Sequence, residues 1–94
     1  LSLVTTAKEI HILPVERFVK RDKRTFDFIY IDPPFAYRYK ADLISRIDNR
    51  ELLATPGRLI LHLPAEERLP ERIGRLVRED RRQYGGSMLL FYTK

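Results

Sequence analysis

A short apolar run that ends abruptly in two prolines constrains this 94-residue chain more than any other feature. Residues 26–31 read Phe-Asp-Phe-Ile-Tyr-Ile and favour a strand buried on both faces, as in the middle of a parallel sheet. Pro33 and Pro34 have no backbone N–H, so the strand has to end near Asp32. The sequence therefore predicts a carboxylate, two rigid peptide units and the ring of Phe35 at a carboxyl strand end, where open α/β sheets bind ligands.

The elements around this strand predict an α/β fold with one mixed sheet. Short strands are expected over residues 9–13 and 58–63, and an amphipathic helix over residues 41–53 leads to the second of them. Residues 27–63 then form a right-handed βαβ unit, and we expect the first three strands to be mutually parallel.

The segments at the amino-terminal side are expected to be helical. Residues 1–7 place Leu1, Leu3 and Val4 on one helical face, which indicates the tail of a helix. Pro14 suits a helix start, and residues 15–23 are expected to form a short helix after it.

The carboxyl-terminal third predicts a hairpin. Residues 76–84 and 87–93 flank Gly85-Gly86, and the charged first arm suits an edge strand. A helix over residues 71–82 is the alternative. Residues 65–73 are expected to be a loop with a short helix from Pro70.

Composition limits the classes of function. Eighteen Lys and Arg stand against 13 Asp and Glu, and the net charge of +5 favours a polyanionic partner, although mild basicity is also common in ordinary proteins. The absence of cysteine excludes disulfides and thiolate metal sites. His11 and His62 fall on separate predicted strands and are expected to be plain strand side chains, so no metal site is predicted. No apolar run is long enough for a membrane span, and the expected location is the cytoplasm.

A mixed aromatic and basic stretch follows the prolines. Residues 36–40 read Ala-Tyr-Arg-Tyr-Lys, a composition that suits stacking on bases and contacts with phosphates. The candidate substrate-binding residues are therefore Phe35, Tyr37, Arg38 and Lys40. The open alternative is an exposed loop with packed tyrosines.

The sequence Asp-Pro-Pro-Phe at residues 32–35 resembles the (Asp/Asn)-Pro-Pro-(Tyr/Phe/Trp) motif of amino-methyltransferases at every position. Those enzymes use S-adenosylmethionine to methylate exocyclic amines of nucleic-acid bases or a glutamine amide. The resemblance implies that the catalytic residues are Asp32, Pro33, Pro34 and Phe35. In this scheme, the Asp32 carboxylate and the Pro33 carbonyl accept the amine hydrogens, Phe35 stacks on the extruded base, and Asp32 also lies beside the cofactor.

Nearly the whole chain resembles the carboxyl-terminal half of the RsmD family, bacterial methyltransferases of a guanine 2-amino group in small-subunit ribosomal RNA. The resemblance implies half of a Rossmann-like class I methyltransferase sheet, with parallel strands and a carboxyl-terminal antiparallel hairpin. Residues 1–94 would then be a partial methyltransferase domain without the family's glycine-rich cofactor loop. We therefore expect weak binding of S-adenosylmethionine by this chain alone, and either an exposed apolar sheet edge or a dimer that covers it.

The expected partner is ribosomal RNA or a small-subunit assembly intermediate, with no membrane. Two alternatives stay open. DNA adenine or cytosine amino-methylases carry the same motif. A non-catalytic basic RNA-binding module could use residues 32–35 only to end a strand.

Overall fold

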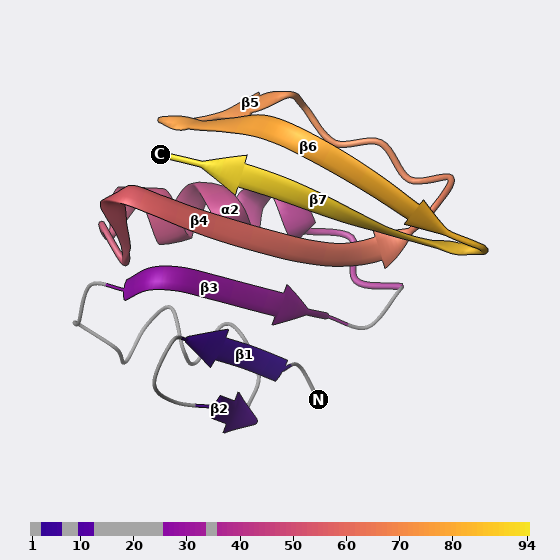
Figure 1. The fold of residues 1–94 in the computed structure, drawn as a ribbon, viewed down its shortest axis with the longest axis horizontal. Coiled ribbons are helices and arrows are strands. Elements are labelled where there is room, and N and C mark those ends of the chain that lie inside the picture. The colour runs from indigo at the N-terminus through magenta and orange to yellow at the C-terminus, as the bar shows by residue number, and fades with distance from the viewer. Residues whose placement is uncertain (1–2, 7–9, 13–25, 34–35) are drawn as a thin grey trace.

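The computed structural model describes residues 3–6, 10–12, 26–33 and 36–94, and within them it shows a seven-stranded mixed sheet with a helix against one face (Figure 1). The strand order is β2-β1-β3-β4-β7-β6-β5. The elements are β1 (Leu3–Thr6), β2 (Ile10–Ile12), β3 (Phe26–Asp32), α2 (Lys40–Asn49), β4 (Leu53–Pro64), β5 (Arg72–Ile73), β6 (Leu76–Tyr84) and β7 (Ser87–Thr93). The predicted α/β fold, one mixed sheet with parallel strands and a carboxyl-terminal antiparallel hairpin, is confirmed.

Strands β3 and β4 form the predicted parallel pair, joined by α2. Ile29 lies opposite Leu59, and Ile31 lies opposite Leu61. All four side chains are fully buried, because alternate residues of both strands face α2. The parallel pairing directs the carboxyl ends of β3 and β4 to the same edge of the sheet, the right-hand edge in Figure 1.

The helix is shorter than the sequence predicts, and the next strand is longer. Helix α2 ends at Asn49, and Glu51 takes a positive φ of 54° in the turn that follows. Leu52 and Leu53 are buried all the same, since they enter the core from the turn and the start of β4. Their apolar side chains continue the helical periodicity by coincidence, which explains the overlong prediction.

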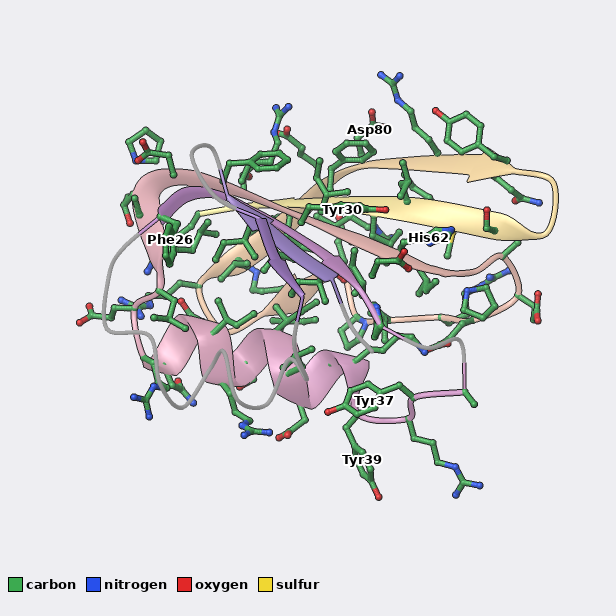
Figure 2. The ribbon with its side chains drawn as sticks, turned by 90° about the horizontal axis from the view of Figure 1, so that it is seen from below. Phe26, Tyr30, Tyr37, Tyr39, His62 and Asp80 are labelled. Atoms are coloured by element: carbon green, nitrogen blue, oxygen red, sulfur yellow. The ribbon has the colours of Figure 1, made fainter. Side chains whose placement is uncertain are left out.

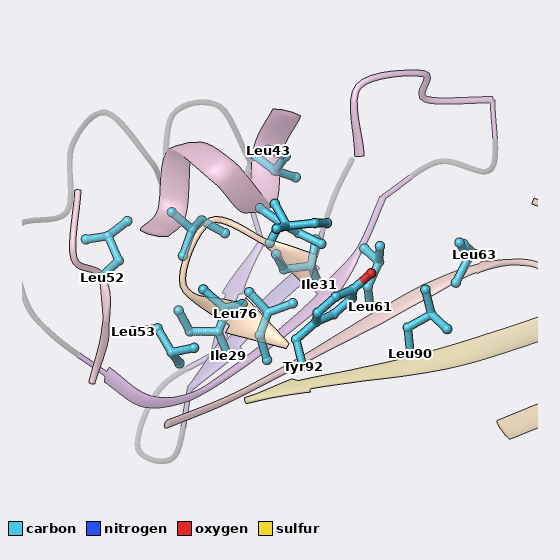
Figure 3. Close-up of a cluster of buried hydrophobic side chains, with 14 of the residues drawn as sticks. Ile29, Ile31, Leu43, Leu52, Leu53, Leu61, Leu63, Leu76, Leu90 and Tyr92 are labelled. Carbon is cyan, nitrogen blue, oxygen red and sulfur yellow. The ribbon is translucent and has the colours of Figure 1, made fainter. Parts of the chain in front are cut away.

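The core lies between α2 and the sheet (Figure 3). Helix α2 contributes Leu43, Ile44 and Ile47, all fully buried. The sheet contributes side chains from five strands: Ile29, Ile31, Leu53, Leu59, Leu61, Leu63, Ile73, Leu76, Met88, Leu90 and Tyr92. Burial of each large apolar side chain stabilises the fold by about 1.5–3 kcal/mol, so this layer fixes the relative positions of β3 and β4.

The carboxyl-terminal hairpin is confirmed, and the helical alternative for residues 71–82 is excluded. Strand β7 pairs antiparallel with both β6 and β4 and lies between them. The predicted helix from Pro70 is wrong, because Arg72 and Ile73 pair with the start of β6 as strand β5. Gly74, with a φ of +60°, forms the tight turn that brings Ile73 opposite Leu76 in the core.

The amino-terminal prediction needs a correction. Residues 3–6 form strand β1 instead of a helix tail, and β1 pairs antiparallel with β3. Val4, Thr5 and Thr6 are β-branched, and the open edge of β3 offers them a partner. Strand β2 runs in the same direction as β3, as predicted, but β1 separates the two. The helix predicted over residues 15–23 lies outside the described residues.

Candidate active site at the carboxyl end of β3

Asp32 is the last residue of β3, and it lies where the sequence predicts the strand to end. Its side chain is 40% exposed, whereas Pro33 directly after it is buried. A carboxylate that is anchored by a rigid strand end and remains accessible can meet a ligand without a large rearrangement. Pro34 and Phe35, the other two residues of the motif, lie outside the described residues.

His62 is the partner of Asp32. Its Nδ1 lies 2.9 Å from Oδ1 of Asp32, across the parallel pair β3–β4. An ionised carboxylate has only acceptors, so Nδ1 carries the proton and donates it in this hydrogen bond. The bond engages one carboxylate oxygen, and among the described residues no donor meets Oδ2 of Asp32.

This contact depends on the register of β3 and β4, which the sequence alone does not determine. Ile31 and Leu61 are in register, so Asp32 and His62 are the next residues along two parallel strands. Asp32 directly precedes Pro33, whereas His62 lies two residues before Pro64, so counting back from the two prolines would have placed Asp32 opposite Leu63 instead. His62 is thus more than the plain strand side chain that was predicted. Within the described part of the chain, no group of three or more metal-ligating side chains forms, so Asp32 and His62 are not part of such a cluster there.

Tyr30, two residues before Asp32 on β3, also contributes to the electrostatics of this site. Side chains two apart on a strand share a face, so Tyr30 and Asp32 lie on the same side of the sheet. Partial burial, and secondarily the charge of Asp32, raise the pKa of the Tyr30 phenol. Tyr30 therefore stays protonated and neutral over the physiological range and offers a hydroxyl donor on this face.

The loop that leads into α2 carries the predicted substrate-binding residues. Arg38 is exposed, and Tyr39 is 63% exposed. Tyr37 packs partly against the core and meets the Tyr39 ring edge-on, with ring centroids 5.9 Å apart (Figure 2). Of these two tyrosines, Tyr39 therefore presents more surface to a ligand than the predicted Tyr37.

Lys40 differs from the prediction of an exposed phosphate contact. Its side chain is fully buried, and its Nζ donates to the carbonyl oxygen of Tyr37 at 2.6 Å and to Oε1 of Glu67 at 2.9 Å. A buried ammonium needs such partners, because an uncompensated charge in the interior is costly. Glu67 comes from the turn after β4, so Lys40 fastens the loop before α2 to that turn. We assign it a structural role.

A comparison with protein families identifies the chain. The family model described as Conserved hypothetical protein 95 matches residues 3–93. The chain belongs to this family. The family is RsmD-like, so the resemblance drawn from the sequence is confirmed. A search of curated proteins gave no match.

Solved structures share the fold. A conserved hypothetical protein from Streptococcus pyogenes superimposes with a TM-score of 0.82 at 23% identity, over 87% of this chain and 51% of that one. An Escherichia coli protein, yhhF, provisionally described as a methyltransferase, gives 0.68 at 17% identity, over 82% and 42%. A Haemophilus influenzae protein, provisionally described as a methylase, gives 0.72 at 17% identity, over 86% and 51%.

The chain thus spans about half the length of these solved structures. Sequence identities this low establish a shared fold, and they do not by themselves assign a reaction to this chain. Among the described residues, no helix is both long and apolar enough to span a membrane.

Proposed function

We propose that the protein methylates an exocyclic amine of a nucleic-acid base, namely the 2-amino group of a guanine in small-subunit ribosomal RNA, with S-adenosylmethionine as the donor. One observation carries this proposal. The accessible Asp32 carboxylate stands at the carboxyl end of β3 and is hydrogen-bonded by His62 through one oxygen only. The RsmD-like family and the provisional descriptions of two structural neighbours support the reaction class.

The chemistry needs acceptors placed beside the amine. The lone pair of an exocyclic amine is delocalised into the ring, so the nitrogen is a poor nucleophile. An N–H bond directed to Oδ2 of Asp32 draws the nitrogen toward a tetrahedral geometry and frees its lone pair for attack. The Pro33 carbonyl would be the second acceptor, and the ring of Phe35 would hold the base. Positioning of this kind gives most of the rate.

Asp32 also gives the departing proton a destination. Once the nitrogen has gained a methyl group, it has to release one hydrogen as a proton. The oxygen of Asp32 that is free of His62 already accepts that hydrogen in the complex, so the proton moves along an existing hydrogen bond. His62 keeps its own proton on Nδ1 throughout.

S-adenosylmethionine, when bound, supplies the activated methyl group. This chain offers Asp32 at the strand end where the cofactor would lie, and its accessible carboxylate suits a polar ligand. The four glycines at positions 57, 74, 85 and 86 do not form a glycine-rich cofactor loop. We therefore propose that this chain alone binds the cofactor weakly.

The nucleic-acid substrate fits the charges near the site. The net charge is +5, and Arg38 and Tyr39 are exposed in the loop that follows the motif. A cation beside an exposed ring matches the phosphate and the base of an unstacked nucleotide. A ribosomal RNA substrate also agrees with the cytoplasmic location expected from the sequence.

The test is methyl transfer from labelled cofactor to unmethylated ribosomal RNA and to assembled small subunits, in the complete protein that carries this chain. Asp32→Ala should lower kcat by roughly 10²–10³, in line with the loss of one preorganised polar contact to a reacting group. Asp32→Asn should be milder, because an amide oxygen still accepts. Asp42→Ala is the matched control, since Asp42 is an exposed acid on α2 that pairs with Arg46.

Three other results of this experiment would lead to different conclusions. Full activity of Asp32→Ala at saturating substrate would show that the motif only ends a strand, and the proposal would be wrong. Transfer to DNA in place of RNA would assign the alternative of a DNA amino-methylase. RNA binding without any methyl transfer by the parent protein would assign the non-catalytic RNA-binding module.

A further inference from the structure

The β6–β7 hairpin ends at the same edge of the sheet as the candidate active site. Ser87 at the start of β7 lies opposite Pro64 at the end of β4, and the Ala65 N–H donates to the Gly86 carbonyl at 3.0 Å. Figure 1 shows the turn of this hairpin at the edge toward which β3 and β4 point. Residues 81–87, called the hairpin tip below, therefore lie on the side of the molecule that carries Asp32.

The hairpin tip also shares a face with the site. Asp32 contacts His62, His62 lies opposite Leu89, and Leu89 lies opposite Arg82. Directly opposed side chains point to the same face of a sheet, so these four residues form a row across it. Three strand spacings separate the two ends of the row, which is about 14 Å. Tyr84, two residues after Arg82, points to the same face.

Contacts within the sheet hold the Arg82 guanidinium in place. Its Nε donates to Oδ2 of Asp80 at 3.1 Å, and its central carbon lies 5.9 Å from the centroid of the Phe91 ring. Figure 2 shows Asp80 on the side of the sheet away from α2. Hydrogen bonds with Asp80 and with the Tyr84 hydroxyl raise the pKa of Arg82. The cation is therefore oriented before any ligand arrives.

An aromatic ring is open to solvent on the same face as the Arg82 guanidinium, and a second exposed cation leaves the other face of β6. Tyr84 is 58% exposed, one of two large aromatic side chains that are so exposed in the described part of the chain. Arg81 is exposed too, but it lies opposite the buried Leu90, so its side chain leaves the other face of β6. Within the described residues its guanidinium has no partner.

Glu79 is paired with Arg58 at 2.6 Å, so it does not neutralise Arg81 directly. Asp80 is the acid next to the tip, and its carboxylate accepts from the Arg81 backbone N–H at 2.7 Å as well as from Nε of Arg82. Glu66 is a second exposed acid, directly after the Ala65 whose N–H donates to the Gly86 carbonyl.

The turn itself allows a close approach. A side-chain carbon added at Gly85 or Gly86 would meet nothing within 4 Å. Ladder pairing with β7 extends to Tyr84, opposite Ser87, so the exposed groups stand on a paired strand rather than on a loop. Strand β5 pairs with β6 only at Leu76 and Val77, so among the described residues the tip end of β6 is the edge of the sheet. A rigid edge strand with a ring and a cation on one face and a second cation on the other suits a single strand of nucleic acid along this edge, in which bases stack on the ring and phosphates meet the cations.

We infer that the hairpin tip is a second contact surface for single-stranded RNA, on which Tyr84 stacks a base and Arg81 and Arg82 bind phosphates of nucleotides that flank the target base. The inference rests on the proposed function, because it takes RNA as the substrate. The hairpin tip then binds the RNA strand at a distance from Asp32 while the target base occupies the active site.

The test measures affinity of the complete protein for unmethylated small-subunit ribosomal RNA transcribed in vitro, at several salt concentrations. Tyr84→Ala should raise Kd on the order of 10-fold, and Tyr84→Phe should keep the parental value because the ring remains. Arg81→Ala should make the slope of log K against log salt shallower by roughly 0.7, the value for one phosphate contact on a single strand.

Two further variants sharpen the assignment. Arg72→Ala is the matched control, because Arg72 is an exposed arginine at the other end of the hairpin, opposite Val77, and its loss should leave the affinity unchanged. Glu66→Gln should bind RNA more tightly, since it removes one acidic charge near the hairpin tip. All these side chains are exposed, so their replacement leaves the core intact.

Two results would contradict the role of the hairpin tip without contradicting the proposed function. If Tyr84→Ala and Arg81→Ala bind RNA like the parent while Asp32→Ala loses methyl transfer, the proposed function stands and the hairpin tip is not a contact surface. If the same variants lose affinity equally for DNA of the same sequence, the assignment of the tip to RNA is wrong. Loss of RNA affinity by the tip variants alone, with Arg72→Ala unchanged, is the expected result.

Discussion

Nδ1 of His62 lies 2.9 Å from Oδ1 of Asp32, and this hydrogen bond joins the ends of two parallel strands at the candidate active site. The two side chains are partly exposed, 26% for His62 and 40% for Asp32, so water competes with the contact. Its main effect is therefore on the geometry of the carboxylate. A carboxylate held through one oxygen presents the other in a defined direction.

Replacement of His62 should lower turnover without abolishing it. His62→Ala removes one hydrogen bond, typically worth about 0.5–1.5 kcal/mol, and we expect kcat to fall roughly 2- to 10-fold. His62→Asn should recover most of the loss, because its amide nitrogen can donate to Asp32 from a similar position. The measurement is steady-state methyl transfer to ribosomal RNA, with kcat and KM determined separately.

A purely structural role for His62 would give a different pattern. In that case His62→Asn and His62→Ala would lower thermal stability equally, and kcat at a temperature well below unfolding would stay at the parental value. His11→Ala tests whether loss of the other histidine of the chain has any effect of its own.

The sequence was sufficient for the elements whose signals are local. The run of residues 26–31 with its proline stop identified β3 and its end at Asp32, and Gly85-Gly86 identified the hairpin. Both signals depend on backbone properties of the residues themselves. The contact of Asp32 with His62 had no such local signal, because it depends on the register of β3 and β4.

Features that depend on distant partners could not be predicted in this way. Lys40 looked like an exposed cation in a basic stretch, and only the position of Glu67, 27 residues further on, explains its burial. Residues 3–6 had a weak helical pattern, and the open edge of β3 determined that they form a strand instead. Tertiary partners overrode local preference in both places.

Lys40 and Arg38 should respond differently to substitution, although the sequence predicts the same role for both. Lys40→Met leaves Glu67 and the Tyr37 carbonyl without their donor, so we expect the free energy of unfolding to fall by about 1–3 kcal/mol. Arg38 is exposed, so Arg38→Ala should leave stability unchanged and weaken RNA binding in a salt-dependent way. Thermal unfolding and RNA affinity at two salt concentrations separate the two. A stable Lys40→Met variant with a reduced salt slope would restore Lys40 as a phosphate contact.

Asp48 should be important for the stability of the region where α2, β5 and β6 meet. Its buried carboxylate accepts from the backbone N–H and from Nε of Arg75, both at 3.0 Å. Asp48→Ala should lower the free energy of unfolding by about 1–3 kcal/mol, and Asp48→Asn by less, because one acceptor remains. Denaturant unfolding measures both.

Gly74 provides the control for this region, since a side-chain carbon there would collide with the Asp48 carboxylate. Gly74→Ala should be destabilising in the parent and less so in an Asp48→Ala background, where the collision is relieved. The remaining loss reflects the positive φ of +60°. Strict additivity of the two substitutions would contradict the direct contact.

The buried hydroxyl of Tyr92 should make stability depend on alkaline pH. Tyr92 is fully buried and donates to the Pro70 carbonyl at 2.7 Å. Burial raises the pKa of this phenol, although nearby Arg78 partly opposes the effect. A raised pKa in the folded state means that the unfolded chain loses the proton first. The stabilisation is therefore complete below about pH 10, the ordinary pKa of tyrosine, and is lost as pH rises further.

Tyr92→Phe separates this effect from the general alkaline loss of stability. At neutral pH the variant should be less stable by about 1 kcal/mol, because the hydrogen bond to Pro70 is lost. Above about pH 10 the difference should shrink, since phenylalanine has no proton to release. The measurement is denaturant unfolding of both proteins from pH 7 upward, with Tyr84→Phe as control, because the Tyr84 side chain is exposed. Parallel stability curves for Tyr92→Phe and the parent would show that Tyr92 does not titrate on unfolding, which contradicts the prediction.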